Sequence, residues 1–156
     1  MKTRGISFLF SGDYEPHLHN LFKGIDLSQY MFYLTDNETL YFNEQTGQAD
    51  ANFFKNGIYT GTQFEKIIKS KEYYIIHIRI FAVPIGEGLD IENIKDYNTF
   101  IKSSCEFVLL CADSYADFYA KDENIIKTVL TNCKNNCYEN IKIITSENDV
   151  RIGFDI

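Results

Sequence analysis

A chain of 156 residues has the length of one domain, and its 45% hydrophobic and 15% aromatic content is typical of a compact globular protein. The formal net charge of −7 opposes binding to nucleic acids or anionic membranes, because both are bound through clusters of Lys and Arg. No apolar run is long enough for a transmembrane helix, and the basic N-terminus is not followed by the apolar stretch of a signal peptide. We therefore expect a cytoplasmic protein whose four cysteines are reduced thiols.

The first third of the chain predicts a strand, a helix and a hairpin. Residues 5–10 alternate in the manner of a strand, and a helix is expected to begin near Pro16 and to end at Gly24. A turn at residues 35–38 is expected to join two further strands, at residues 30–34 and 39–42.

The segment from residue 44 to residue 61 lacks a sustained period and is expected to be the longest irregular one. Thr62 and Glu65 then have the spacing of a capping box, which predicts a helix that ends near Ser70. Residues 73–81 are expected to form the next strand.

A short helix and a hairpin follow in the second half. Asp90 or Asp96 is expected to cap the helix. Residues 105–121 begin with an almost unbroken apolar run, which is typical of a strand buried on both faces. Asp113-Ser114 supplies the turn, so this stretch is expected to be the central hairpin of the sheet.

The last helix and a closing hairpin complete the chain. Asp122 is expected to cap a helix whose apolar positions fall at spacings of three and four. This buried stripe is predicted to comprise Ile125, Ile126, Val129, Leu130, Cys133 and Cys137. Residues 141–145 and 150–156 are expected to pair as two strands, the second with Val150, Ile152, Phe154 and Ile156 on its buried face.

The predicted fold is therefore a single α+β domain with a largely antiparallel sheet covered by helices, in the order βαββα-βαββα-ββ. This order suggests two similar halves, residues 1–72 and 73–140, before a C-terminal hairpin at residues 141–156. The local support is a helix-to-strand step that recurs at an offset of 33 residues. Either an internal duplication or independent convergence on the same local pattern explains this recurrence.

One strand face carries groups that suit a ligand. With strict alternation, Tyr73, His77 and Arg79 share one face of the strand at residues 73–81, where a phenol, a base and a cation line up. The alternative is a half-buried sheet face whose polar groups satisfy one another. His17 and His19 point about 200° apart on a helix, so they do not chelate one ion, and we expect both to face solvent.

Acidic residues gather in the second half of the chain, where residues 81–156 carry a net charge of −6 against −1 for residues 1–80. Those around the central hairpin are candidates for binding a basic partner: Asp113, Asp117, Asp122 and Glu123. The alternative is that they are solvated turn and cap residues. Cys133 and Cys137 are one helical turn apart, but their place in the apolar stripe favours buried structural thiols over a metal site.

The common catalytic and nucleotide-binding motifs do not occur. Gly86-x-Gly88 lacks the other glycines of a phosphate loop, and neither Gly-x-Ser-x-Gly nor His-Glu-x-x-His is found. We therefore expect no cofactor, no metal and no catalytic residue.

Three short segments resemble a family of small bacterial proteins catalogued as domain of unknown function 2691. They are Arg4-Gly5-Ile6-Ser7-Phe8, Lys121-Asp122-Glu123-Asn124-Ile125-Ile126, and Ile144-Thr145-Ser146-Glu147-Asn148-Asp149-Val150-Arg151. The resemblance implies a bacterial protein with no assigned activity, and it carries over no functional residue. The element order is also similar, without a shared motif, to bacterial effector-binding proteins made of tandem strand-helix-strand-strand units, which hold small molecules between their halves.

Two functions remain as hypotheses. The first is a non-catalytic interaction module, inhibitor-like or immunity-like, whose acidic surface binds a basic protein. The second is a small-molecule effector-binding domain that uses the groove face of Tyr73, His77 and Arg79. Nothing in the sequence predicts the oligomeric state.

Overall fold

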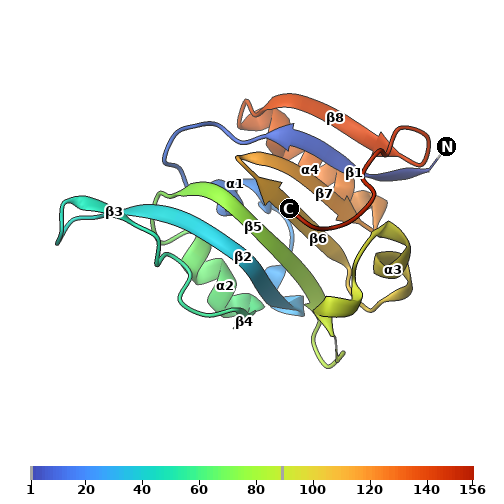
Figure 1. Cartoon of the computed structure of the whole chain (residues 1–156), viewed down its shortest axis with the longest axis horizontal. Coiled ribbons are helices and arrows are strands. Elements are labelled where there is room, and N and C mark those ends of the chain that lie inside the picture. The colour runs from blue at the N-terminus through green and yellow to red at the C-terminus, as the bar shows by residue number, and fades with distance from the viewer. Residues whose placement is uncertain (1, 89) are drawn as a thin grey trace.

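The chain folds around one antiparallel sheet (Figure 1). The computed structural model describes residues 2–88 and 90–156. Seven strands follow the order β3-β2-β5-β6-β7-β1-β8, and β4 pairs with β2. The strands are β1 (Thr3–Leu9), β2 (Tyr30–Asn43), β3 (Gln48–Asp50), β4 (Ile58–Thr60), β5 (Tyr74–Pro84), β6 (Phe107–Ala112), β7 (Tyr115–Ala120) and β8 (Glu139–Thr145). All pairings between them are antiparallel, which confirms the α+β class.

Short helices cover the sheet. They are α1 (His17–Leu21), α2 (Gly61–Ile68), α3 (Tyr97–Lys102) and α4 (Glu123–Asn135), with 3-10 turns η1 (Leu27–Gln29) and η2 (Ile91–Asn93). Asp90, Asp96 and Asp122 each accept a backbone N–H bond at the start of a helix or 3-10 turn, as predicted. The capping box of α2 is Thr60 with Gln63, two residues before the expected pair, because Thr60 is still extended when the chain enters the helix.

The central hairpin is confirmed. Strand β6 lies between β5 and β7, and Leu109 pairs with Ile80 on one side and Phe118 on the other. Asp113 and Ser114 form the turn, both with positive φ (51° and 66°). Two residues in this conformation match the twist of a tight hairpin, and Asp tolerates it better than most residues.

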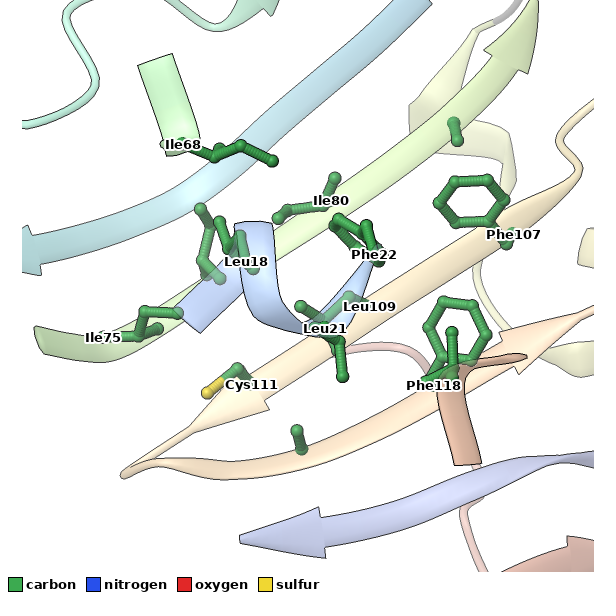
Figure 2. Close-up of a cluster of buried hydrophobic side chains, with 14 of the residues drawn as sticks. Leu18, Leu21, Phe22, Ile68, Ile75, Ile80, Phe107, Leu109, Cys111 and Phe118 are labelled. Carbon is green, nitrogen blue, oxygen red and sulfur yellow. The ribbon is translucent and has the colours of Figure 1, made fainter. Parts of the chain in front are cut away.

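The first face of the sheet carries the larger hydrophobic core. Figure 2 shows Leu18, Leu21 and Phe22 of the α1 segment above side chains of β5, β6 and β7. Helices α2 and α4 extend this cover on the same face, with Phe64 and Val129 both fully buried. The apolar periodicity of α4 therefore predicted this face correctly for Ile126, Val129 and Cys133.

The second face carries a separate core under a different cover. Phe100 of α3 and Phe154 of the C-terminal segment lie against Tyr119 and the neighbouring strands, with the rings of Phe154 and Tyr119 5.1 Å apart. Figure 1 shows this segment crossing in front of the sheet, with α1, α2 and α4 behind it.

The expected strand at residues 150–156 is wrong. The segment has no regular structure, Val150 and Ile152 are 90% and 95% exposed, and only Phe154 is buried. The Phe154 N–H donates to the carbonyl of Lys95 and not to β8. Residues 150–156 thus alternate in sequence as a strand does, but in the structure only the ring of Phe154 anchors them.

The expected turn at residues 35–38 is also wrong, because β2 runs through it as one strand of 14 residues. The register between β2 and β5 shifts between the pairs Thr35/Arg79 and Thr39/Ile75, and Asp36 has a positive φ of 50°. The turn-forming residues therefore make a β-bulge.

The two similar halves are not confirmed. Strand β1 pairs with β7 and β8, so β5, β6 and β7 lie between it and β2. In the second half, β5 and β6 are direct neighbours. The corresponding strands of the two halves thus differ in their pairing.

Candidate functional site

The structure separates the three residues that sequence analysis placed on one strand face. Tyr73 and Ile75 lie in the first core together with Ile78, which strict alternation would put on the opposite face from Ile75. The register shift opposite Glu38 supplies the extra residue. Tyr73 therefore does not share a face with His77 and Arg79. The prediction of one groove lined by all three residues is wrong.

Tyr73 is a structural residue of the first core. Its hydroxyl donates to the carbonyl of Ile68 (2.9 Å) and accepts from the N–H of Leu18 (2.8 Å). Burial raises the pKa of Tyr73 far above its usual range, so the side chain stays neutral. The phenol joins the end of α2 to the start of α1.

His77 and Arg79 bind the bulge of β2. His77 Nε2 lies 3.2 Å from a Glu38 carboxylate oxygen, and Arg79 Nε donates to Asp36 at 2.6 Å. Arg79 also donates to the carbonyl of Phe154 at 3.5 Å, which links β5 to the C-terminal segment. Both residues thus have partners within the fold.

The four acidic candidates are spread along the hairpin. Asp113 is at its tip, whereas Asp122 and Glu123 begin α4 after the far end of β7. Asp117 lies between them and accepts from Arg151 Nε at 2.7 Å. The structure does not bring the four together.

Three carboxylates lie near enough to Tyr30, at one end of the sheet, to influence the charge of its phenol. Burial, together with the negative charges of Glu106, Asp122 and Asp26, raises the pKa of Tyr30. Glu87 lies in the turn after Pro84, which ends β5 and pairs with Tyr30. We call this group, with the neighbouring Glu123, the acidic end. Asp122 and Glu123 are adjacent and were among the predicted acidic candidates, whereas Asp26, Glu87 and Glu106 come from separate segments that no local pattern joins.

His17 is buried, contrary to the expectation that it faces solvent. It is 0% exposed, with Nδ1 3.1 Å from the Tyr138 hydroxyl and Nε2 2.8 Å from the Asp13 carbonyl. Burial lowers the pKa of His17, although the Asp13 carbonyl and the Glu15 carboxylate oppose that shift. His17 therefore stays neutral near pH 7.

The expectation for the thiols is wrong for Cys137. It lies beyond the end of α4, with a positive φ of 55°, and is exposed, whereas Cys133 is buried in the helix stripe. Cys105 and Cys111 are buried as expected. Burial raises the pKa of Cys105, Cys111 and Cys133 to about 12.

Within residues 2–88 and 90–156, no three His, Cys, Asp or Glu side chains are grouped as metal ligands would be. In the same residues, no helix combines the length and the apolar character that crossing a membrane requires.

A surface depression lies near the end of β2 that leads into β3, which Figure 1 shows at the far end of the molecule from α3. Its outer hollow, of about 1190 Å³, lies between the loop before α1, the hairpin from β2 to β3, and the residues after α2. The lining residues are Tyr14, Pro16, Tyr41, Phe42, Asn43, Glu44, Gln45, Lys69, Ser70, Lys71 and Glu72. Phe42 is 59% exposed here, an unusual state for a large aromatic ring.

An inner hollow of about 300 Å³ continues from the outer one and shares Tyr41, Ser70 and Lys71 with it. The other lining residues are Asn52, Phe53, Lys55, Asn56, Tyr59 and Ile67. A third hollow of about 280 Å³ shares Asn56, Tyr59 and Ile67 with the inner one and adds Gln63 and Lys66. We call the three together the lysine-lined trough.

The trough is cationic on an acidic protein. None of Lys55, Lys66, Lys69 and Lys71 has an ion-pair partner among the described residues. The Lys71 ammonium lies 4.4 Å from the centre of the Tyr41 ring, a cation–π contact that holds it at the junction of the two hollows. The trough thus combines cations, amides and aromatic rings. Sequence analysis missed it because its walls come from four separate segments.

The two ends of the chain meet on the opposite side of the molecule. Arg4 of β1 donates to Asp149 at 3.1 Å, and the Tyr119 hydroxyl donates to the same carboxylate at 2.9 Å. Gly5 lies so close to β7 that a Cβ there would be 1.8 Å from the carbonyl oxygen of Phe118, so only glycine fits. Two of the three segments that carried the family resemblance, residues 4–8 and 144–151, thus meet here and join the sheet to the C-terminal segment.

Comparison with known proteins agrees with that resemblance. The model of a family described as protein of unknown function (DUF2691) matches residues 3–155. The chain is 30% identical over 155 residues to the uncharacterized protein YncE of Bacillus subtilis (strain 168), covering 99% of both chains. No solved structure gives a significant match. The chain therefore belongs to the DUF2691 family of proteins of unknown function.

Proposed function

We propose that this protein is a non-catalytic binding protein that holds a small molecule in the lysine-lined trough. The observation that carries the proposal is the continuity of the two hollows, which share Tyr41, Ser70 and Lys71. The inner hollow of about 300 Å³ is at the lower end of the size of ligand pockets, and the outer hollow provides room for the rest of a larger compound.

The lining suits binding more than bond making. Its polar groups are lysine ammonium groups, amide side chains, hydroxyls and, in the outer hollow, the carboxylates of Glu44 and Glu72, which hold a ligand through hydrogen bonds and charge. The apolar walls are Phe53 and Tyr59, both nearly buried and held in place by the first core. A buried apolar wall with exposed lysines at its rim favours reversible binding.

A fragment screen followed by amide NMR tests this proposal. We expect hits to shift the amide resonances of residues 52–59 and 67–71, which line the inner hollow. Ser70→Trp should reduce these shifts, because the exposed Ser70 lines both hollows and a bulky ring there fills them. Thr131→Trp, on the exposed side of α4, is the matched control and should bind as the wild type does. A screen in which every hit maps elsewhere contradicts the proposal.

The second candidate is an interaction module that presents the acidic end to a basic protein. It is favoured by the approach of Asp26, Glu106 and Asp122 to Tyr30, since carboxylates from three separate segments then lie at one end of the sheet. Charge of one sign accelerates the encounter with an oppositely charged partner.

Charge reversal tests whether the acidic end binds a partner or only keeps the protein in solution. Glu87→Lys, Glu106→Lys and Glu123→Lys together should weaken capture of a basic partner and reduce the salt dependence of its association. The matched control reverses Asp13, Glu139 and Glu147, which are exposed and lie on the loop before α1, at the start of β8 and just after β8. Equal capture by both triple variants would remove the acidic end as the binding surface.

A further inference from the structure

We infer that the ligand of the trough is a small aromatic anion, whose carboxylate or phosphate group binds between Lys55 and Lys71 in the inner hollow. This inference rests on the proposed function and specifies its ligand class. The aromatic part of the ligand then lies in the outer hollow, against the exposed rings of Phe42 and Tyr14.

The distribution of charge along the trough places the anion. The outer hollow contains Glu44 and Glu72 beside Lys69 and Lys71, so its charges balance. The inner hollow contains Lys55 and Lys71 and is lined by no carboxylate in the described part of the chain. An anion therefore gains most in the inner hollow, where two cations face it without a competing acid.

Asp50, which contacts the trough residue Tyr41, already accepts hydrogen bonds on both of its carboxylate oxygens. One of its oxygens accepts from the Tyr41 hydroxyl and the Asn43 amide, each at 3.2 Å, and the other accepts from the Asn52 N–H at 2.8 Å. These hydrogen bonds lower the pKa of Asp50, so the carboxylate stays ionised and bound within the β2–β3 hairpin. Lys55 and Lys71 make no ion pair with it.

Neutral donors complete the anion site. The side-chain amide of Asn56 lines the inner hollow without a hydrogen-bond partner among the described residues, whereas that of Asn52 already bonds to Asp50. The Tyr59 hydroxyl accepts from the Asn56 N–H at 2.8 Å, which leaves its own hydrogen to donate. Two cations and several donors around one hollow match the oxygens of a carboxylate or a phosphate.

The aromatic part of the ligand follows from the outer wall. Tyr14 stacks on Tyr74 with ring centres 6.1 Å apart and is itself 38% exposed, so its outer surface is open. Phe42, at 59% exposure, extends the apolar surface on the β2 side. A flat ring that covers both removes apolar area from water, which a linear polar anion does not do.

A charge series on one ring system tests the inference. The probes are 2-naphthoate, 2-naphthyl phosphate, 2-naphthalenemethanol, 2-naphthylmethylammonium and inorganic phosphate, titrated against the full chain by amide NMR. We expect the two aryl anions to bind at the inner hollow about tenfold more tightly than the alcohol, with the ammonium and inorganic phosphate weaker still. The affinity of the two aryl anions should fall as the salt concentration increases.

Single variants locate the two halves of the site. Lys55→Gln and Lys71→Gln should each weaken the aryl anions several-fold and leave the alcohol unchanged, because only the charge is lost. Lys127→Gln and Lys134→Gln on the exposed side of α4 are the matched controls and should change nothing. Phe42→Ser should weaken the binding of 2-naphthoate, 2-naphthyl phosphate and 2-naphthalenemethanol by a similar factor.

The outcomes separate the two claims. If the alcohol or the ammonium compound binds the trough as well as the anions do, the ligand class is wrong and the proposed function stands. If inorganic phosphate binds as tightly as 2-naphthyl phosphate, the aromatic half of the inference is wrong. If no probe and no library compound shifts the trough resonances, the proposed function itself fails.

Discussion

The two faces of the sheet are covered in different ways. The first face lies under three helices whose side chains interlock with the strands, and Leu18 and Phe64 there are completely buried. The second face lies under the six-residue helix α3, the turn η2 and an irregular segment anchored by Phe154. Helices bury a repeating stripe of side chains, whereas the irregular segment relies on one ring and a few polar contacts. We therefore expect the second face to open at lower free-energy cost than the first.

The largest effect is expected from truncation within the central strand, where neighbouring residues belong to different faces. Leu109→Ala removes a fully buried side chain from the first core and should cost about 2–5 kcal/mol through lost burial and a cavity. Leu110→Ala makes the same change in the second core. Its loss of unfolding free energy should lie in the same range but be smaller than that of Leu109→Ala, because the looser cover relaxes around the cavity. Denaturant unfolding measures both values. A larger loss for Leu110→Ala reverses the proposed order of the two faces.

A smaller loss is expected when the second face loses its anchor. A buried Phe→Ala change commonly costs about 3–5 kcal/mol. For Phe154→Ala we expect less than this, because residues 150–156 can detach without unfolding the sheet. The variant should also bind an apolar dye, since Tyr119 and Phe100 become accessible. Ile152→Ala, at 95% exposure, is the control and should change stability by less than about 0.5 kcal/mol.

The first face should respond to pH through His17. Its pKa in the folded chain is lowered by burial, so the unfolded chain binds the proton more readily. The stabilisation by neutral His17 is therefore present above the usual pKa of 6.5 and is lost as the pH falls below that value toward the folded pKa.

The measurement is the change in unfolding free energy between pH 7 and pH 5. We expect it to be smaller in His17→Gln than in the wild type, because glutamine does not titrate while it keeps a donor and an acceptor. The partially exposed His19 provides the control variant, His19→Gln, which should keep the wild-type dependence. An unchanged pH dependence in His17→Gln would assign the acid sensitivity to other groups.

The smallest effect is a difference in labelling rate among the thiols. Cys137 is exposed and should react first with a thiol reagent in the native state. Cys105 belongs to the second core, whereas Cys111 and Cys133 belong to the first, and burial raises the pKa of all three to about 12. Their labelling therefore waits for local opening. Cys105 should precede the other two, and mass spectrometry of single-cysteine variants follows the order. Simultaneous labelling would indicate that both faces open together.

The candidate site was hardly predictable from the sequence. Tyr73, His77 and Arg79 alternate perfectly in the chain, yet a single extra residue in the pairing of β2 and β5 moves Tyr73 into the first core. Lys55 and Lys71 lie in different segments and show no joint pattern, and the structure brings them together around one hollow. A sequence pattern reports neighbours a few residues apart, and both of these features depend on distant contacts.

The sequence by itself determined the elements whose cause is local. The hairpin turn at Asp113 and Ser114, the caps at Asp90, Asp96 and Asp122, and the buried stripe of α4 each follow from residues within one or two turns of chain. Tertiary structure alone decided the bulge in β2, the path of residues 150–156 and the lysine-lined trough. In each of these, several local conformations have similar energy, and packing against strands far away in the sequence selects one of them.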